Sequence, residues 1–155
     1  GSVFKILFPA AQALPVEAGA AGVVQPLTGS ETILLVEDEP GVRKFIRDLL
    51  SSKGYRILEA ENGRTALGAA VAETGPIHLL ITDLIMPEMG GVELLQRFGE
   101  LFPTVPVLLM SGYSDRAIPP GLPGIAIEKP FTPGVLLRTV REALDKRFTG
   151  PAHAG

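Results

Sequence analysis

The chain has 155 residues, enough for one domain with a real hydrophobic core and short flanking segments. Its formal net charge of −3 gives no basic excess of the kind that nucleic-acid binding requires. No cysteine is present, which excludes disulfides, thiol catalysis and cysteine–zinc sites and suits a reducing compartment. Prolines and glycines interrupt the longest charge-poor stretch, residues 6–30, so the sequence predicts neither a transmembrane helix nor a signal peptide.

Residues 1–30 differ in sequence pattern from the rest of the chain. Residues 1–9 (GSVFKILFP) are typical of a single strand that ends at Pro9, and we interpret them as the last piece of a preceding domain. Gly1-Ser2 is equally typical of a cloning remnant. Residues 10–30 show neither a helical nor a strand period and predict a flexible linker. We therefore expect the folded domain over residues 31–148 and a tail over 149–155.

Strand and helix patterns alternate from Glu31 onward. Buried strands are predicted at 32–36, 55–60, 77–82, 105–110 and 125–127. Helices are predicted over 40–53, from 62 to about 75, over 92–101 and from 132 onward. Either Asp38 or Glu39 is expected to cap the first of these helices.

One segment breaks this alternation. Residues 112–124 (GYSDRAIPPGLPG) should hold the fourth helix, but their prolines and glycines leave room for little more than a turn at 114–118. We therefore expect five helices, of which the fourth is short or irregular. The repeated βα units predict an α/β fold with a doubly wound, five-stranded parallel sheet in the order 2-1-3-4-5.

Chemically active side chains follow four of the predicted strands. Glu37 and Asp38 follow the first strand, and the others follow the third, fourth and fifth strands in turn: Asp83, Ser111 and Lys129. Because the carboxyl ends of parallel strands meet at one edge of a sheet, these residues should share one pocket. A buried carboxylate at Asp83 needs a cation, which Lys129 or a metal beside the acidic pair would supply. Carboxylates, a hydroxyl and an ammonium together suit Mg²⁺ and a phosphoryl group.

The motifs around these residues resemble those of a known family. LLVEDEP, LLITDLIMPEMGG, LLMSGY and EKPF are similar to the motifs of receiver domains in two-component response regulators, and the resemblance covers residues 31–147. It implies a flavodoxin-like fold and phosphorylation of an aspartate by a phosphohistidine donor with Mg²⁺. It also implies that the domain catalyses its own aspartyl phosphorylation and dephosphorylation.

The resemblance assigns roles to the acidic residues. Asp83 is implied to be the phosphoacceptor. The implied metal site consists of Glu37, Asp38, Asp83 and the backbone carbonyl of Ile85. Within it Asp38 is a direct ligand, and Glu37 orients water on the metal.

Two further residues are implied to contact the phosphoryl group. Ser111 is the switch hydroxyl that follows this group, and Lys129 neutralises its charge. The bond between Lys129 and Pro130 is often cis in the family, which an X–Pro bond tolerates.

The N-terminal residues indicate a wider context. GSVFKILFP resembles the final strand of a histidine-kinase ATP-binding domain, and the linker before GSETILLVEDEP is similar to the join in hybrid sensor histidine kinases. This implies a C-terminal receiver whose partner is a histidine-kinase core or a histidine phosphotransfer protein, with no nucleic acid and no direct membrane contact. We expect a cytoplasmic location, with any membrane anchor elsewhere in the parent kinase. The oligomeric state does not follow from the sequence.

Two other functions compete with phosphorylation of Asp83. A pseudo-receiver would only bind partner proteins, and the complete set of site residues argues against it. A phosphatase of the haloacid dehalogenase type also uses an aspartate nucleophile and Mg²⁺, but it needs a second aspartate where Ile85 stands. His78, at the start of a strand, is expected to be either structural or a surface residue rather than a phosphohistidine.

Overall fold

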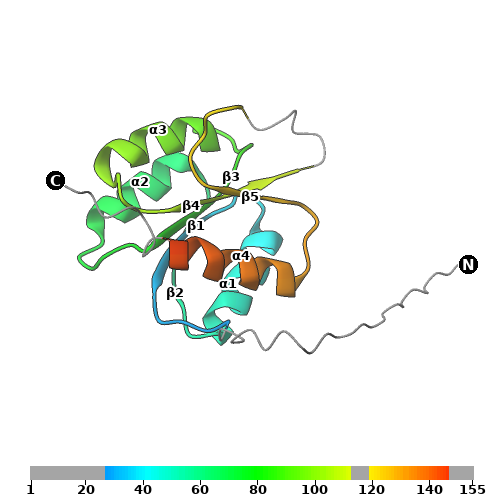
Figure 1. Cartoon of the computed structure of the whole chain (residues 1–155). Helices are drawn as coiled ribbons and strands as arrows, with labels where there is room; N and C mark the ends of the chain where they lie inside the picture. The colour runs from blue at the N-terminus through cyan, green and yellow to red at the C-terminus, as the bar shows by residue number, and fades with distance from the viewer. Residues whose placement is uncertain (1–26, 113–118, 147–155) are drawn as a thin grey trace, which may run out of the picture.

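The computed structural model describes residues 27–112 and 119–146, which form five strands and four helices (Figure 1). In chain order these are β1 (Thr32–Val36), α1 (Pro40–Ser52), β2 (Arg56–Ala60), α2 (Gly63–Ala72), β3 (Leu79–Asp83), α3 (Gly91–Leu101), β4 (Val107–Ser111), β5 (Ile125–Glu128) and α4 (Pro133–Lys146). The strand predicted at 1–9, most of the predicted linker and the predicted tail lie outside the described residues.

The strands form one parallel sheet in the order β2-β1-β3-β4-β5, which confirms the predicted flavodoxin-like arrangement. At the end of β1, Val36 pairs with Ala60 of β2 on one side and with Thr82 of β3 on the other. All five strands run the same way, so their carboxyl ends form one edge of the sheet.

The sheet is covered on both faces, which explains the continuous apolar runs in the sequence. Ile33 and Leu35 pack on the side of α1 and α4, whereas Leu34 and Val36 pack on the side of α2 and α3. Figure 1 shows these two pairs of helices on opposite sides of the sheet. Because β1, β3 and β4 are buried along their whole length, a closely packed core fixes the residues that follow them.

Capping residues set the starts of the first two helices. Glu39 caps α1: its side chain accepts a hydrogen bond from the N–H of Gly41 (3.3 Å), and Pro40 occupies the first helical position. Of the two predicted candidates, Glu39 is therefore the capping residue, and Asp38 precedes the helix. Asn62 begins α2 through a capping box.

Of the five expected helices, the described residues contain four. Residues 113–118 lie outside the described part of the chain, and the turns at 119–124 contain no helix, so α4 is the helix that was expected fifth. Within residues 27–112 and 119–146, no helix is both long and apolar enough to cross a membrane.

Three apolar residues that repeat at helical spacing with core residues are nevertheless exposed: Phe45, Val71 and Leu101. Each lies on a helix whose central apolar positions are buried, such as Ile46 on α1. A period of 3.6 residues identifies the apolar side of a helix, but only the middle of that side faces the sheet.

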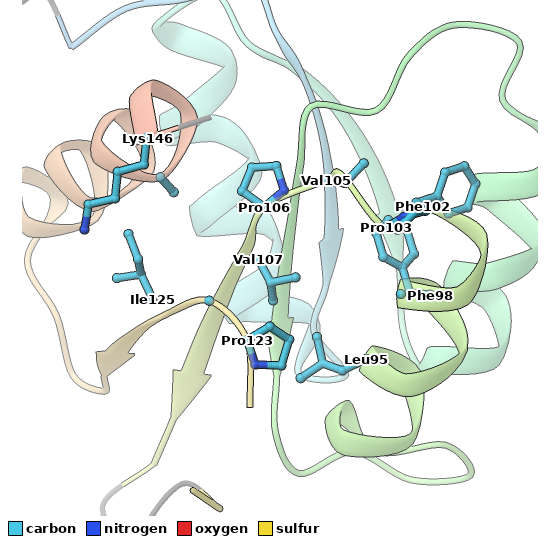
Figure 2. A pocket seen from close by; sticks show the side chains of 13 residues that line it. Leu95, Phe98, Phe102, Pro103, Val105, Pro106, Val107, Pro123, Ile125 and Lys146 are labelled. Atoms are coloured by element: carbon cyan, nitrogen blue, oxygen red, sulfur yellow. The ribbon is translucent and has the colours of Figure 1, made fainter. Parts of the chain in front are cut away.

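An open apolar cavity of about 470 Å³ lies near the start of β4, between the C-terminal parts of α3 and α4. Figure 2 shows Phe98 and Phe102 on the α3 side, Val107 and Ile125 on the strands, and Lys146 on α4. The cavity lies away from the carboxyl ends of the strands, so it takes no part in the site described below.

Residues 27–31 pack against α1 and α4 before β1 begins. Leu27 contacts the apolar cluster between these helices and the sheet, and Arg141 of α4 forms an ion pair with Glu31 (2.7 Å). Gly54, with a φ of 99°, allows the backbone of Gly29 to approach closely, because a Cβ atom at Gly54 would collide with the Gly29 carbonyl oxygen. The chain is therefore held to the domain before its first strand.

Candidate functional site

The residues of the predicted site lie together at the carboxyl edge of the sheet. Glu37 and Asp38 directly follow β1, and Asp83 is the last residue of β3. Ser111 is the last residue of β4, and Lys129 directly follows β5. Four segments that are far apart in the sequence thus meet because their strands are parallel.

The Lys129 ammonium lies between two carboxylates. Its Nζ atom is 2.6 Å from Oδ2 of Asp83 and 2.7 Å from Oε2 of Glu37. The side chain of Glu37 is 1% exposed and that of Asp83 is 10% exposed, so water screens these ion pairs weakly. The lysine supplies the cation that a buried aspartate requires.

Burial and the shared lysine shift two pKa values. Burial raises the pKa of the Glu37 carboxyl, against the opposing hydrogen bonds from Lys129 and the Glu39 N–H. Burial alone would lower the pKa of Lys129, but hydrogen bonds to Asp83 and Glu37 outweigh it and raise this pKa above 10.5. The stabilisation that Lys129 gains from its partners is therefore present below pH 10.5 and is lost only as the pH rises through the raised value.

The donor atoms of this site suit a hard divalent cation. One carboxylate oxygen from each of Glu37, Asp38 and Asp83 lies within 4.8 Å of the other two, and Mg²⁺ prefers such oxygen ligands. In the described part of the chain no hydrogen-bond donor contacts the exposed carboxylate of Asp38, which leaves its oxygens for a cation. The Ile85 N–H donates to Oδ1 of Asp83 (3.3 Å), while the Ile85 carbonyl as a metal ligand stays a prediction.

Ser111 and Lys129 are joined through the backbone. The Lys129 N–H donates a hydrogen bond to the carbonyl oxygen of Ser111 (2.8 Å), and Ser111 is buried. The bond between Lys129 and Pro130 is cis, as the sequence resemblance implies. The two residues expected to contact a phosphoryl group thus lie at the carboxyl ends of neighbouring, hydrogen-bonded strands.

The loop after Asp83 packs closely on its backbone. Gly91 begins α3, and a Cβ atom at this position would collide with the Asp83 carbonyl oxygen. The Thr82 hydroxyl donates a hydrogen bond to the same oxygen (2.9 Å). The close packing at Gly91 and the hydrogen bond from Thr82 therefore hold the backbone of Asp83 in place.

A comparison with protein families identifies the family to which this fold belongs. The family model described as response regulator receiver domain matches residues 33–141, which include every predicted site residue.

This chain belongs to the response regulator receiver domain family.

Sequence relatives of the receiver domain include a much longer protein. The sensor kinase CckA of Brucella abortus (strain 2308) is 36% identical over 159 residues, which cover 95% of this chain but 17% of that protein. The response regulator receiver protein CpdR of the same strain is 36% identical over 57% of this chain and 72% of its own length. The chain therefore spans a small part of CckA and resembles most of CpdR.

Solved receiver domains share the fold of this one. The receiver domain of the hybrid histidine kinase CckA matches with a TM-score of 0.63 at 38% identity, covering 73% of this chain and 98% of that one. The response regulator TrrA of Thermotoga maritima, crystallised with Mg²⁺–BeF, matches with a TM-score of 0.65 at 28% identity, covering 74% and 99% of the two chains.

Two contacts in this receiver domain were not predicted from the sequence. One is the ion pair between Lys129 and Glu37, and the other is a hydrogen bond from Arg43 Nη1 to the Glu37 carbonyl oxygen (2.6 Å). The one signal for the second contact is a basic residue early in the helix that follows the acidic pair. Helices carry basic residues for many reasons, so this signal alone does not identify Arg43.

Proposed function

We propose that this receiver domain accepts a phosphoryl group from phosphohistidine onto Asp83 in a Mg²⁺-dependent reaction that it catalyses itself. The observation that carries the proposal is the Lys129 ammonium, 2.6 Å from the Asp83 carboxylate and beside the three clustered carboxylates. Phosphoryl transfer requires such positioned cations. Mg²⁺ held by Asp38, Asp83 and the Ile85 carbonyl, with Glu37 beside it, would neutralise charge on the phosphoryl oxygens. The Mg²⁺–BeF complex of the similar TrrA supports this proposal.

The proposed reaction moves one phosphoryl group between two nucleophiles. A carboxylate oxygen of Asp83 forms a bond to phosphorus while the bond from phosphorus to the donor histidine nitrogen breaks. The electron pair of the broken bond stays on the imidazole, which takes up a proton from solvent. Lys129 and the Ser111 hydroxyl each bind an oxygen of the transferred group, so these two residues contribute position and charge while Asp83 forms the covalent bond.

We also propose that the chain is part of a hybrid sensor histidine kinase and that its donor is a histidine-kinase core or a histidine phosphotransfer protein. The similarity to CckA covers 95% of the chain, so it extends into residues 1–30. The strand and linker patterns in residues 1–30 support the same context. The proposal also includes the domain boundaries predicted from the sequence and a cytoplasmic location for the receiver domain.

Intact-mass analysis tests the proposed chemistry. After incubation with acetyl phosphate and Mg²⁺, a mass gain of one phosphoryl group is expected, and EDTA should prevent it. Acetyl phosphate needs no protein partner, so the result depends on the receiver domain alone. A folded protein that gains no mass would favour a pseudo-receiver, which only binds partner proteins.

An exposed apolar surface beside the site suits a protein donor. It is a shallow depression formed by α1 and the loop after β5, and it is lined by Gly41, Val42, Phe45, Lys129, Pro130 and Phe131. Phe45 is 45% exposed, and exposed apolar clusters of this kind mark binding surfaces. Because Lys129 contacts both this depression and Asp83, a donor docked here would have its phosphohistidine close to the phosphoacceptor.

Phe45→Ala is expected to slow phosphoryl transfer from a phosphorylated histidine phosphotransfer protein about tenfold, because burying this side chain contributes about 1.5 kcal/mol. Transfer from acetyl phosphate should keep its rate, since a small donor needs no docking surface. Leu101→Ala is the matched control, because Leu101 is also apolar and exposed but ends α3. Equal transfer rates from the protein donor in the two variants would contradict docking at Phe45.

A further inference from the structure

One cationic side chain holds the backbone of the acidic pair. Nη1 of Arg43, on α1, donates a hydrogen bond to the carbonyl oxygen of Glu37 (2.6 Å) and lies 3.5 Å from that of Asp38. The Arg43 side chain is 20% exposed, so these contacts are partly shielded from water. Two consecutive carbonyl groups therefore face one guanidinium, which restricts the directions in which the two carboxylates leave the loop.

Glu59 of β2 keeps the Arg43 guanidinium in place. Oε1 of Glu59 lies 3.6 Å from Nε of Arg43, and its Oε2 lies 3.2 Å from Nη1 of Arg47. Glu59 pairs with Leu35 of β1 in the sheet, so its backbone is fixed beside the strand that leads to the acidic pair. Both arginines share this carboxylate, but within residues 27–112 and 119–146 Arg47 makes no hydrogen bond to the carbonyls of the acidic pair.

We propose that Arg43 is a positioning residue for the metal site: it orients Glu37 and Asp38 toward Mg²⁺ without binding the ion. This inference rests on the proposed function, because it assumes that the acidic pair binds Mg²⁺.

Other contacts already hold the backbone N–H groups of the loop. The Glu37 N–H donates to the Ala60 carbonyl (3.1 Å), and the Glu39 N–H donates to Oε1 of Glu37 (3.1 Å). Arg43 supplies the matching contacts on the carbonyl side.

Arg43 has two opposing effects on Mg²⁺ binding. Its positive charge repels the ion, but the carboxylate of Glu59 lies beside it and offsets that charge. Its hydrogen bonds order the ligands, and loss of such an outer contact typically lowers metal affinity by about 10- to 100-fold. We therefore expect the loss of order to outweigh the loss of repulsion when Arg43 is replaced.

The experiment measures the Mg²⁺ dissociation constant of the whole chain by isothermal titration calorimetry. Arg43→Gln should weaken Mg²⁺ binding by about tenfold or more. Arg43→Lys, which keeps the charge but not the forked donor group, should have an intermediate affinity. Arg47→Gln loses the same partner, Glu59, and should bind Mg²⁺ as the wild type does. Amide hydrogen exchange at Glu39 should be faster in Arg43→Gln, because the loop is less ordered.

The outcomes separate this role from the function on which it rests. Wild-type or tighter Mg²⁺ binding by Arg43→Gln would overturn the positioning role alone, and so would an equal weakening in Arg47→Gln. A wild-type protein that binds no Mg²⁺ would overturn the proposed function and the positioning role together. If thermal unfolding shows that Arg43→Gln does not fold, Arg43→Lys decides: weaker binding supports the role, and wild-type affinity overturns it.

Discussion

Lys129→Met is expected to destabilise the metal-free protein by about 3 kcal/mol at neutral pH. The substitution removes the ammonium that lies 2.7 Å from Glu37 and 2.6 Å from Asp83, and it leaves two buried carboxylates without a cation. Urea unfolding in the presence of EDTA measures this loss. Burial raises the pKa of the Glu37 carboxyl and the hydrogen bond from Lys129 opposes this, so removal of the lysine leaves the raised pKa unopposed by it. The loss of stability should therefore grow as the pH rises and be smaller at about pH 5 than at about pH 7.

Mg²⁺ should reverse most of this loss. A divalent cation among the three clustered carboxylates replaces the missing charge, so Lys129→Met should gain more stability from Mg²⁺ than the wild type gains. Lys44→Met is the matched control, because Lys44 pairs with Asp48 on the solvent-exposed surface of α1 and should leave the urea midpoint nearly unchanged. Similar midpoints for the two variants in EDTA would contradict the role assigned to Lys129.

Asp83→Asn is expected to abolish phosphorylation while leaving the fold intact. An amide oxygen is a far weaker nucleophile than a carboxylate, so neither acetyl phosphate nor a protein donor should transfer a phosphoryl group. The asparagine side chain can still accept a hydrogen bond from Lys129, whose ammonium keeps its contact with Glu37 (2.7 Å). The free energy of unfolding should therefore change by no more than about 1–2 kcal/mol.

Intact-mass analysis with acetyl phosphate and Mg²⁺ measures the effect of Asp83→Asn, and urea unfolding confirms that the variant is folded. Asp48→Asn is the control, because Asp48 is an exposed aspartate on α1 and its variant should gain one phosphoryl group as the wild type does. A mass gain in Asp83→Asn would show that another residue accepts the phosphoryl group.

The bounds of β1 and the start of α1 could be predicted to the residue, because strong local signals define them. A run of buried residues from Thr32 precedes the acidic pair, and Pro40 fits only the first turn of a helix. The prediction for β3, 77–82, was less accurate, since the strand spans Leu79–Asp83. His78 is structural, as expected: its Nδ1 accepts a hydrogen bond from the Thr32 N–H (2.9 Å), a long-range contact that no local pattern reveals.

The proximity of the candidate site residues could be predicted, but several of their contacts could not. Asp83 and Lys129 come together because parallel strands share a carboxyl edge, which the strand order alone decides. The contacts of Glu37 with Lys129 and Arg43 depend on side-chain reach and on the curvature of a loop, which residue spacing does not encode. The exposed Phe45 was also missed, because helical periodicity does not distinguish a core residue from one at the margin of the apolar side.

The attachment of residues 27–31 to α4 through Arg141 determines where the preceding chain leaves the domain. That point lies at the start of β1, whereas Asp83 lies at the opposite edge of the sheet, about 16 Å away along a five-residue strand. A donor histidine tethered through this end would therefore meet Asp83 at an effective concentration set by how readily the tether passes around the domain. The length of the tether would then control transfer within one molecule, while a donor on a second molecule would be insensitive to it.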